Sequence, residues 1–361
     1  MSPPLALPHL NRVATAVPEH DVHLAFLGFA RTLLEDDRAR LVFDRMAERS
    51  GIAHRYSNFR PGSLEAGEVD ADGFYRRGAF PSTGARMRLY EPFARTLALE
   101  AIGRLGLEGE TDRITHVVVA SCTGFTAPGL DLQIADRLGL KATVGRTMVG
   151  FMGCSAAVPA LRLAYDTVRA DPRARVLMVN CELSTLHLQE TSDLETVLSF
   201  MLFADGASAA LITADPVGLA LEDFRSEIVP DSAGLITWRI GDQGFDMHLS
   251  GKVPGRIAGA LRGDGEQPCS LLRGLPAGAY DLWAVHAGGR TVLDAVEVGL
   301  ELDPTRLRHS RAVLHEYGNM SSATVMFVLA RILAGQDGSR GIGMAFGPGM
   351  VAESFRFRRA G

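Results

Sequence analysis

The sequence has few cysteines, no long apolar run and no excess of basic charge. Its 361 residues include only Cys122, Cys154, Cys181 and Cys269, too few and too scattered for a disulfide framework. No apolar run approaches the ~20 residues that cross a bilayer, and the first residues, MSPPLALPHL, lack the basic segment and apolar core of a signal peptide. The net charge of −5 argues against a general nucleic-acid binder. These absences predict a compact cytoplasmic protein without a membrane span or nucleic-acid partner.

Short apolar runs alternate with helical patterns along the chain, which is typical of a layered α/β fold. Buried strands are predicted at Ile114–Ser121, Val176–Val179, Ala207–Thr213, Asp281–His286 and Met344–Phe346, with Val313–Leu314 in a strand or its approach. Helices are predicted over 92–107, 130–138, 155–170, 292–298 and 323–334, and a Pro/Gly-rich loop over 263–278. A turn near Thr213–Gly218 separates two stretches of similar rhythm. We therefore predict a duplicated α/β fold with halves at 1–215 and 216–361.

Cys154 is the first residue that could carry chemistry. It follows a strand-like run ending in Gly153, and small residues then begin a helix. The partial positive charge at a helix N-terminus favours a thiolate over a thiol. The alternative is a small cysteine in the core, since free cysteines are often buried. This segment alone does not decide between the two.

His286 and Asn319 are each ambiguous when taken alone. His286 ends a predicted strand before a Gly pair, where α/β proteins place ligand-facing groups, although most single histidines are structural. Asn319 precedes a predicted helix and could simply cap it. Together with Cys154 they form a set of thiol, imidazole and carboxamide that suits acyl transfer followed by carbon–carbon bond formation. Neither the Cys and His spacing of a zinc site nor a GxSxG nucleophile elbow occurs in the sequence.

Several long motifs follow one another along the chain. They are Gly153-Cys154, HAGG from His286, YGNMSSA at 317–323, GPG at 347–349, RMAERSGIAHRY at 45–56, TGFTAPGLD at 123–131, LFADGASAALI at 202–212 and PDSAG at 230–234. Together they resemble the type III polyketide synthases, the chalcone-synthase-like branch of the thiolase superfamily, over roughly residues 20–357. The GFMGC segment that contains Cys154 looks more like the bacterial alkylpyrone and alkylresorcinol synthases than the plant enzymes.

The resemblance implies a five-layered αβαβα thiolase fold, a homodimer and a mechanism that needs no cofactor beyond CoA thioester substrates. Cys154 would accept an acyl group from an acyl-CoA starter, and His286 would pair with the sulfur and keep it ionised. His286 and Asn319 would hold the thioester oxygen of malonyl-CoA during decarboxylation. The enolate would then attack the acyl-Cys154 repeatedly, and the poly-β-keto chain would cyclise.

The resemblance also assigns residues around this set. Phe203 would be the gate between a CoA tunnel and the reaction cavity, where an aromatic wall would exclude water. Plain core packing is the alternative for Phe203. CoA would contact the basic cluster and the Gly pair after His286, namely Arg45, Arg49, Arg55, Gly288 and Gly289.

Some residues depart from the plant pattern. Cys122, followed by Thr123, stands where chalcone synthases have a hydroxyl residue. The resemblance implies that this position, together with Glu182 and Ser321, belongs to a hydrogen-bond chain that promotes aldol closure. A thiol is a weak donor, so we expect weaker aldol closure and some pyrone. Trp238 replaces a small cavity residue and Met247 an aromatic gate residue, which should reshape the cavity.

The starter and the product stay open. The bacterial resemblance favours an aliphatic acyl-CoA and a pyrone or resorcinol. A bacterial synthase that uses only malonyl-CoA and makes a naphthalene product also has a cysteine at the position of Cys122, so this alternative stays open. A β-ketoacyl carrier-protein synthase III, which condenses once, would share the same three residues, and a non-catalytic protein could share the same fold. A thiolase would need a second catalytic cysteine near the C-terminus, and none follows Cys269.

Overall fold

The computed structural model of the chain describes residues 6–63, 68–262 and 269–361. The predicted loop at 263–278 therefore lies partly outside the described residues. Within the described part, no helix combines the length and apolar character needed to span a membrane. The same residues contain no group of three or more His, Cys, Asp or Glu that could hold a metal ion.

The first half builds five strands of a mixed sheet, in the order β5-β4-β6-β7-β1. Strands β4 and β6 run parallel, and β7 runs antiparallel to both β6 and β1. Strands β6 and β7 are buried over their whole length because nearly all their side chains are apolar or small. The bounds are β1 His9–Ala16, β4 His116–Ser121, β5 Gly145–Gly150, β6 Val176–Leu183 and β7 Asp205–Thr213.

The second half repeats this arrangement with one strand fewer among the described residues. Its order β11-β12-β13-β8 and its strand directions match β4-β6-β7-β1. The two sets join where β1 pairs with β8 at His9–Ala220 and Leu10–Leu219, so one nine-stranded sheet runs through this part of the chain. The bounds are β8 Leu219–Ile228, β11 Leu282–Val285, β12 Arg340–Gly347 and β13 Val351–Arg359.

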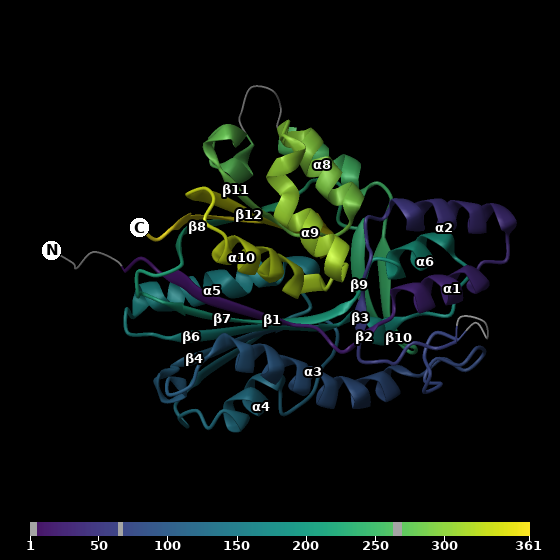
Figure 1. The fold of residues 1–361 in the computed structure, drawn as a ribbon, viewed down its shortest axis with the longest axis horizontal. Helices are drawn as coiled ribbons and strands as arrows, with labels where there is room; N and C mark the ends of the chain where they lie inside the picture. The colour runs from purple at the N-terminus through teal and green to yellow at the C-terminus, as the bar shows by residue number, and fades with distance from the viewer. Residues whose placement is uncertain (1–5, 64–67, 263–268) are drawn as a thin grey trace.

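Helices cover both outer faces and fill the space between the two sets of strands, which confirms the predicted five-layered thiolase fold (Figure 1). Helices α3 (Thr83–Leu105) and α4 (Leu130–Arg137) cover the first set, and α5 (Ala157–Ala170) and α10 (Thr324–Ala334) lie between the sets. Helices α7 (Val253–Arg262), α8 (Arg290–Leu300) and α9 (Arg308–Tyr317) lie beyond the second set. Three buried apolar clusters occupy the interfaces between these layers.

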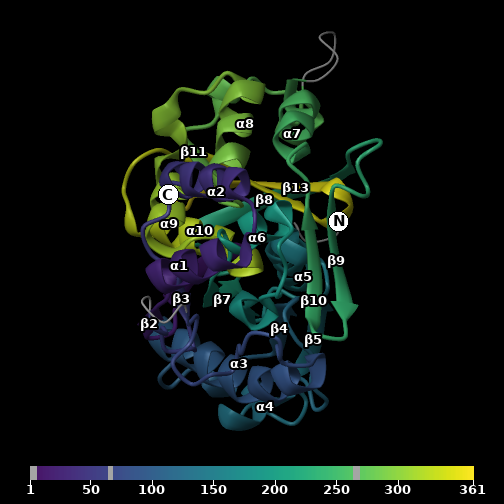
Figure 2. The same ribbon diagram turned by 90° about the vertical axis from the view of Figure 1, so that its right-hand side faces the viewer.

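A smaller group of elements gathers at one end of the layered body, on the right in Figure 1 and toward the viewer in Figure 2. It contains α1 (His23–Leu33), α2 (Asp37–Arg49), α6 (Leu194–Phe200), β2 (His20–Asp21), β3 (Tyr56–Ser57) and the hairpin β9–β10 (Ile236–Gly241 and Gly244–Leu249). Short 3-10 turns occur at Thr111–Arg113, Gly153–Ser155, Ser184–His187, Ser270–Leu272, Ala277–Ala279, Pro304–Leu307, Ser321–Ala323 and Pro348–Met350.

Two local predictions were wrong for identifiable reasons. Val313 and Leu314 lie in helix α9, where they form two adjacent positions of its buried face and not a strand. Helix α3 begins at Thr83 instead of Pro92, because Ser82 caps it and Pro92 is tolerated inside it. Strand β13 was not predicted, although Phe355 and Phe357 alternate with arginines along it.

Candidate active site

Cys154 sits on the tight turn between β5 and α5. Gly153 has φ 61° and lies so close to Pro348 that a Cβ would come within 2.3 Å of the proline ring. Only glycine therefore fits here, and the GPG turn at the end of β12 packs directly on the residue before the cysteine. The 3-10 turn Gly153–Ser155 then leads into α5 and leaves Cys154 partly exposed at the wall of a cavity.

Asn319 is not a helix cap in this structure. Its backbone pairs with the Phe203 segment: its N–H donates to the Leu202 carbonyl at 2.8 Å, and its carbonyl accepts from the Ala204 N–H at 2.9 Å. This pairing directs the side-chain amide toward the Cys154 sulfur, at 3.9 Å, and toward the Gly288 carbonyl, at 3.2 Å. Asn319 is thus not the N-cap of α10, which begins at Thr324, but its side-chain oxygen accepts from the Ser321 N–H at 2.9 Å and so orders the turn before that helix while its amide N–H faces the site.

His286 follows β11 and is 1% exposed. A Cβ built on Gly288 would lie 3.4 Å from its Nε2 atom, so Gly288 lies against the imidazole and also accepts the Asn319 amide. Three side chains far apart in the sequence thus gather around Gly288. Neither ring nitrogen of His286 has a hydrogen-bond partner among the described residues. The expected His286–Cys154 hydrogen bond is therefore absent, and the Asn319 amide contacts the sulfur instead.

Burial controls the ionisation of both groups. It raises the pKa of the Cys154 thiol to about 11, although hydrogen bonds with Ser321 and Asn319 act in the opposite direction. It lowers the pKa of His286 to about 4. Burial therefore favours the thiol and the neutral imidazole over the charged forms, and this desolvation opposes the favourable position of Cys154 before α5.

A buried carboxyl group lies near this pair. Glu182 accepts hydrogen bonds from the Cys122 backbone N–H and the Thr123 hydroxyl, both at 2.9 Å, and from the Ser322 hydroxyl at 2.5 Å. Burial raises its pKa to about 7. The structure corrects the predicted chain at one position, because Ser322 and not Ser321 contacts Glu182. Ser321 has φ 48° and lines the cavity beside Cys154.

The residues that depart from the plant pattern form one wall of the cavity. The Cys122 thiol donates to the Gly153 carbonyl, 3.5 Å away, and it also interacts with the Glu182 carboxyl group. The Trp238 indole N–H donates to the Cys122 carbonyl at 2.8 Å, and Met247 is its cross-strand neighbour in the β9–β10 hairpin. His187, which the sequence did not single out, packs edge-on against Trp238.

Phe203 and Phe200 also line this cavity. We call this cavity the Cys154 chamber; Cys122, Thr123, Gly153, Cys154, Ser184, Phe200, Phe203, Ile236, Trp238, Met247, Ser321 and Pro348 line it. Its volume is about 30 Å³, which is room for about two water molecules. The chamber as it stands is therefore too small for a chain of several ketide units.

A much larger cavity, of about 1100 Å³, opens on the other side of the Gly pair. Gly288 and Gly289 line it, as do Arg49 from the end of α2 and Arg290 from the start of α8. Arg290 was not predicted, although it directly follows HAGG. Gly288 also lies against His286, so this cavity reaches the site from outside. Arg45 is exposed on α2 but does not line the cavity.

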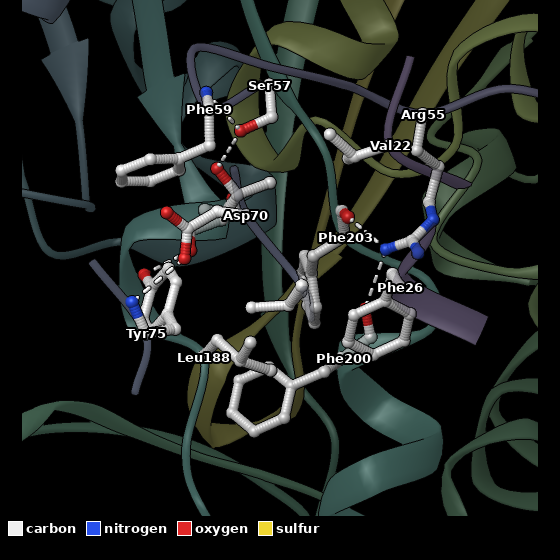
Figure 3. A pocket seen from close by; sticks show the side chains of 13 residues that line it. Val22, Phe26, Arg55, Ser57, Phe59, Asp70, Tyr75, Leu188, Phe200 and Phe203 are labelled. Carbon is white, nitrogen blue, oxygen red and sulfur yellow. Dashed lines mark hydrogen bonds between the residues drawn. The ribbon is translucent and has the colours of Figure 1, made fainter. Parts of the chain in front are cut away.

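Arg55 was predicted to contact CoA, and the structure places it elsewhere (Figure 3). It is 1% exposed, and one guanidinium nitrogen donates to the carbonyls of Phe200 and Phe203 at 2.9 and 2.8 Å. Its Nε donates to His23, and its guanidinium lies over the Phe26 ring. Burial lowers its pKa to about 9. Arg55 therefore fixes the backbone of the gate and cannot reach a CoA phosphate.

The fold and the site define a class of protein. A thiol before a central helix, with a carboxamide in contact with its sulfur and a buried imidazole nearby, is the arrangement of a thiolase-fold condensing enzyme. Matches to two domain families narrow this class. The chain matches the N-terminal domain of chalcone and stilbene synthases over residues 10–216 and their C-terminal domain over residues 221–360. It belongs to this family and is a type III polyketide synthase.

Characterised relatives agree with this assignment. The chain is 34% identical over 339 residues to bisdemethoxycurcumin synthase of Oryza sativa subsp. japonica, covering 86% of this chain and 81% of that one. It is 31% identical over 356 residues to 1,3,6,8-tetrahydroxynaphthalene synthase of Streptomyces griseus, covering 95% and 91%. The solved structure of PKS-I from the brown alga Ectocarpus siliculosus superposes with a TM-score of 0.85 at 30% identity, covering 99% and 100%.

Proposed function

We propose that Cys154 carries the growing acyl chain and that His286 and Asn319 bind the thioester oxygen of malonyl-CoA. The observation that carries this proposal is that the Asn319 amide contacts both the Cys154 sulfur and the Gly288 carbonyl, while Gly288 lies against the His286 ring and lines the 1100 Å³ cavity. A neutral imidazole and an amide N–H can both donate to the enolate oxygen that forms as CO2 leaves. The low pKa of His286 supports this role, because it keeps the ring neutral.

The nucleophile is activated by proton transfer at the moment of acylation. The Cys154 proton moves to His286, and the thiolate attacks the thioester carbon of the acyl-CoA. As the carbon–sulfur bond to CoA breaks, the leaving CoA sulfur takes the proton from His286, which returns to its neutral form. The enolate of the next malonyl-CoA then attacks the acyl carbon and regenerates the cysteine. Arg49, Arg290 and the backbone of Gly288 and Gly289 would hold the CoA moiety in the wide cavity.

The starter is proposed to be an aliphatic acyl-CoA, with the chain released as a pyrone or resorcinol. The second candidate is a malonyl-CoA-only synthase with a naphthalene product, which the 31% identity to the Streptomyces griseus enzyme favours. The small Cys154 chamber, closed by Trp238 and Met247, is compatible with a short starter unless another space opens.

We propose that the protein is a homodimer because one surface of the chain is suited to pairing with a second copy. Strand β5 is an edge strand of the sheet, and large apolar side chains are exposed on it and beside it: Phe125, Leu132, Met148 and Met152. Such an edge with an apolar patch is a pairing surface. Light scattering on the purified protein would give twice the chain mass; a monomer at micromolar concentration would contradict the dimer.

The direct test of the reaction uses labelled malonyl-CoA and a panel of acyl-CoAs with the wild type and Cys154→Ala. The wild type should form CO2 and polyketides. The variant should form no polyketide yet still release CO2, because His286 and Asn319 remain. Cys269→Ala, which changes a cysteine far from the site, is the matched control and should keep both activities. Polyketide formation by Cys154→Ala would refute the proposed role of the sulfur.

A further inference from the structure

The chain turns sharply just before Cys154, and a phenylalanine adopts the left-handed backbone conformation in this turn. Phe151 has φ 59° and Gly153 has φ 61°, so two of the three residues before Cys154 lie in the left-handed region. Glycine enters this region freely, whereas a residue with a Cβ crowds the following carbonyl oxygen. A phenylalanine without other contacts would favour the extended conformation and continue strand β5. Surrounding groups must therefore hold Phe151 in the turn.

Two aromatic side chains from other segments hold the Phe151 ring. The half-exposed Phe125, in the loop after β4, stacks on it with a centroid distance of 5.2 Å. Phe245, from β10, packs edge-on against it at 5.5 Å, and the rings of Phe125 and Phe245 are 6.3 Å apart. We call these three rings the Phe151 clamp. Phe245 is 1% exposed and stacks on His187 at 4.1 Å, which anchors the clamp in the core.

The other end of the turn is held independently of the clamp. Gly153 lies against the Pro348 ring, and its carbonyl accepts from the Cys122 thiol. The turn before Cys154 is therefore fixed at two points, by Pro348 and Cys122 at Gly153 and by the clamp at Phe151. Loss of either point would let the turn relax and would move the sulfur.

The Cys154 sulfur depends on this turn, whereas the other two candidate reactive side chains do not. The backbone of Asn319 pairs with the Phe203 segment, and the His286 N–H donates to the Met344 carbonyl at 2.8 Å. The Asn319 amide nitrogen is 3.9 Å from the sulfur, which is already a long contact. A displacement of the turn by about 1 Å would therefore misalign the sulfur, and such a misplacement can lower a rate by about 10²-fold.

We propose that Phe151 is a positioning residue for the nucleophile: packed in its clamp, it holds the left-handed turn that places the Cys154 sulfur beside the Asn319 amide. The inference rests on the proposed function, because the place of the sulfur matters only if the sulfur carries the acyl chain. Phe151 is not among the residues that line the Cys154 chamber, so it acts through the backbone of the turn. Its loss should slow acyl transfer to Cys154 and leave decarboxylation by His286 and Asn319 in place.

The test compares two products of the same incubation, CO2 released from labelled malonyl-CoA and polyketide. The starter is acetyl-CoA, butanoyl-CoA or octanoyl-CoA, whichever the wild type converts fastest. The readout is the amount of polyketide per CO2, because a smaller folded fraction lowers both amounts and leaves their ratio unchanged. Phe151→Gly removes the ring and the backbone strain together. It should lower the ratio at least about tenfold and keep CO2 release within about threefold of the wild type.

Three further variants separate the ring from the backbone conformation. Phe151→Tyr keeps an aromatic ring in the clamp and should keep the ratio within about twofold of the wild type. Glu301→Gly is the matched control, because Glu301 is also a non-glycine residue with positive φ, 51°, at the exposed end of α8; it should leave the ratio unchanged. Phe151→Leu keeps apolar bulk without a stacking plane and replaces Phe151→Gly if the melting temperature shows that the latter is unfolded. It should lower the ratio at least about threefold.

The opposite results would overturn the positioning role. A wild-type ratio in Phe151→Gly, or in Phe151→Leu in its place, would show that Phe151 only contributes to packing, as would an equal loss of CO2 and polyketide. A loss in Phe151→Tyr as large as in Phe151→Gly would show that the ring contacts do not hold the turn. These results leave the proposed function intact, which is refuted separately if the wild type releases no CO2 from malonyl-CoA.

Discussion

Glu182 and His286, two buried ionisable groups from opposite halves of the chain, have opposite hydrogen-bond environments. Glu182, at the end of β6, accepts three hydrogen bonds from the Cys122 backbone and the hydroxyls of Thr123 and Ser322. His286, just after β11, has none among the described residues. A fully paired group stabilises its surroundings, whereas a buried polar group without a partner costs stability and is free to bind substrate. The difference supports the proposal that His286 acts on the substrate while Glu182 organises the surrounding backbone.

The largest expected effect separates His286 from His187, an equally buried histidine that is fully paired. His187 donates to the Thr123 carbonyl at 2.7 Å and accepts from the Phe245 N–H at 3.0 Å. His286→Ala should lower malonyl-CoA decarboxylation by about 10²–10³-fold and change the free energy of unfolding by less than about 1 kcal/mol. His187→Ala should lower that free energy by at least about 2 kcal/mol. Urea unfolding measures the free energy of unfolding, and CO2 release measures decarboxylation. If both substitutions lowered the free energy of unfolding equally, the proposed difference between the two histidines would be wrong.

The next effect is the pH dependence that Glu182 imposes on stability. Its pKa is about 7 in the folded protein and near 4.5 in the unfolded chain, so the folded state holds the proton more tightly. Stability contributed by this proton is complete below pH 4.5 and is lost as the pH rises to 7. At 1.36 kcal/mol per pKa unit the loss is on the order of 3 kcal/mol.

Glu182→Gln removes this titration. The difference in unfolding free energy between wild type and Glu182→Gln should therefore shift by that amount between pH 4.5 and 7, as followed by urea unfolding. Glu301→Gln, at an exposed position, is the control and should show no such shift. A flat difference would show that Glu182 is ionised throughout and that its three donors outweigh burial.

The smallest effect concerns the two neighbouring residues at the end of β4. The Cys122 thiol faces the Gly153 carbonyl, whereas the Thr123 hydroxyl contacts Glu182. Cys122→Thr should therefore change the ratio of pyrone to aldol products less than about fivefold. Thr123→Val removes a hydrogen bond to the Glu182 carboxyl group and should change this ratio more, up to about tenfold. Product ratios by mass spectrometry decide this, and a larger effect of Cys122→Thr would place the functional hydroxyl at position 122.

Much of the core was predictable because its apolar runs are nearly continuous. The runs at 114–121, 176–179 and 207–213 correspond to β4, β6 and β7, since a strand buried on both faces needs no polar alternation. The hairpin β9–β10 was not predicted, because its strands mix exposed polar and buried apolar residues over only six positions each. Yet this hairpin supplies Trp238 and Met247 to the chamber.

The candidate active site was likewise predictable only in part. Cys154, His286 and Asn319 were identifiable because each motif has a distinctive residue beside glycine or serine. Ser322 and Ser321 are adjacent in one motif, and only the backbone turn at Ser321, with φ 48°, decides which hydroxyl meets Glu182. The role of Arg55 was misread because an arginine in a basic motif is usually exposed, and nothing local reveals that it is covered by the segment around Phe200.

The sequence by itself determined the layered fold, the family and the three candidate reactive side chains, because these depend on local patterns of apolar residues and on short motifs. Only the tertiary structure decided that burial disfavours the charged forms of the thiol and the imidazole, that Arg55 holds the carbonyls of Phe200 and Phe203, and that Phe203 lines a second cavity besides the Cys154 chamber. Desolvation and cavity shape depend on atoms contributed by segments far apart in the chain, and no local pattern encodes them.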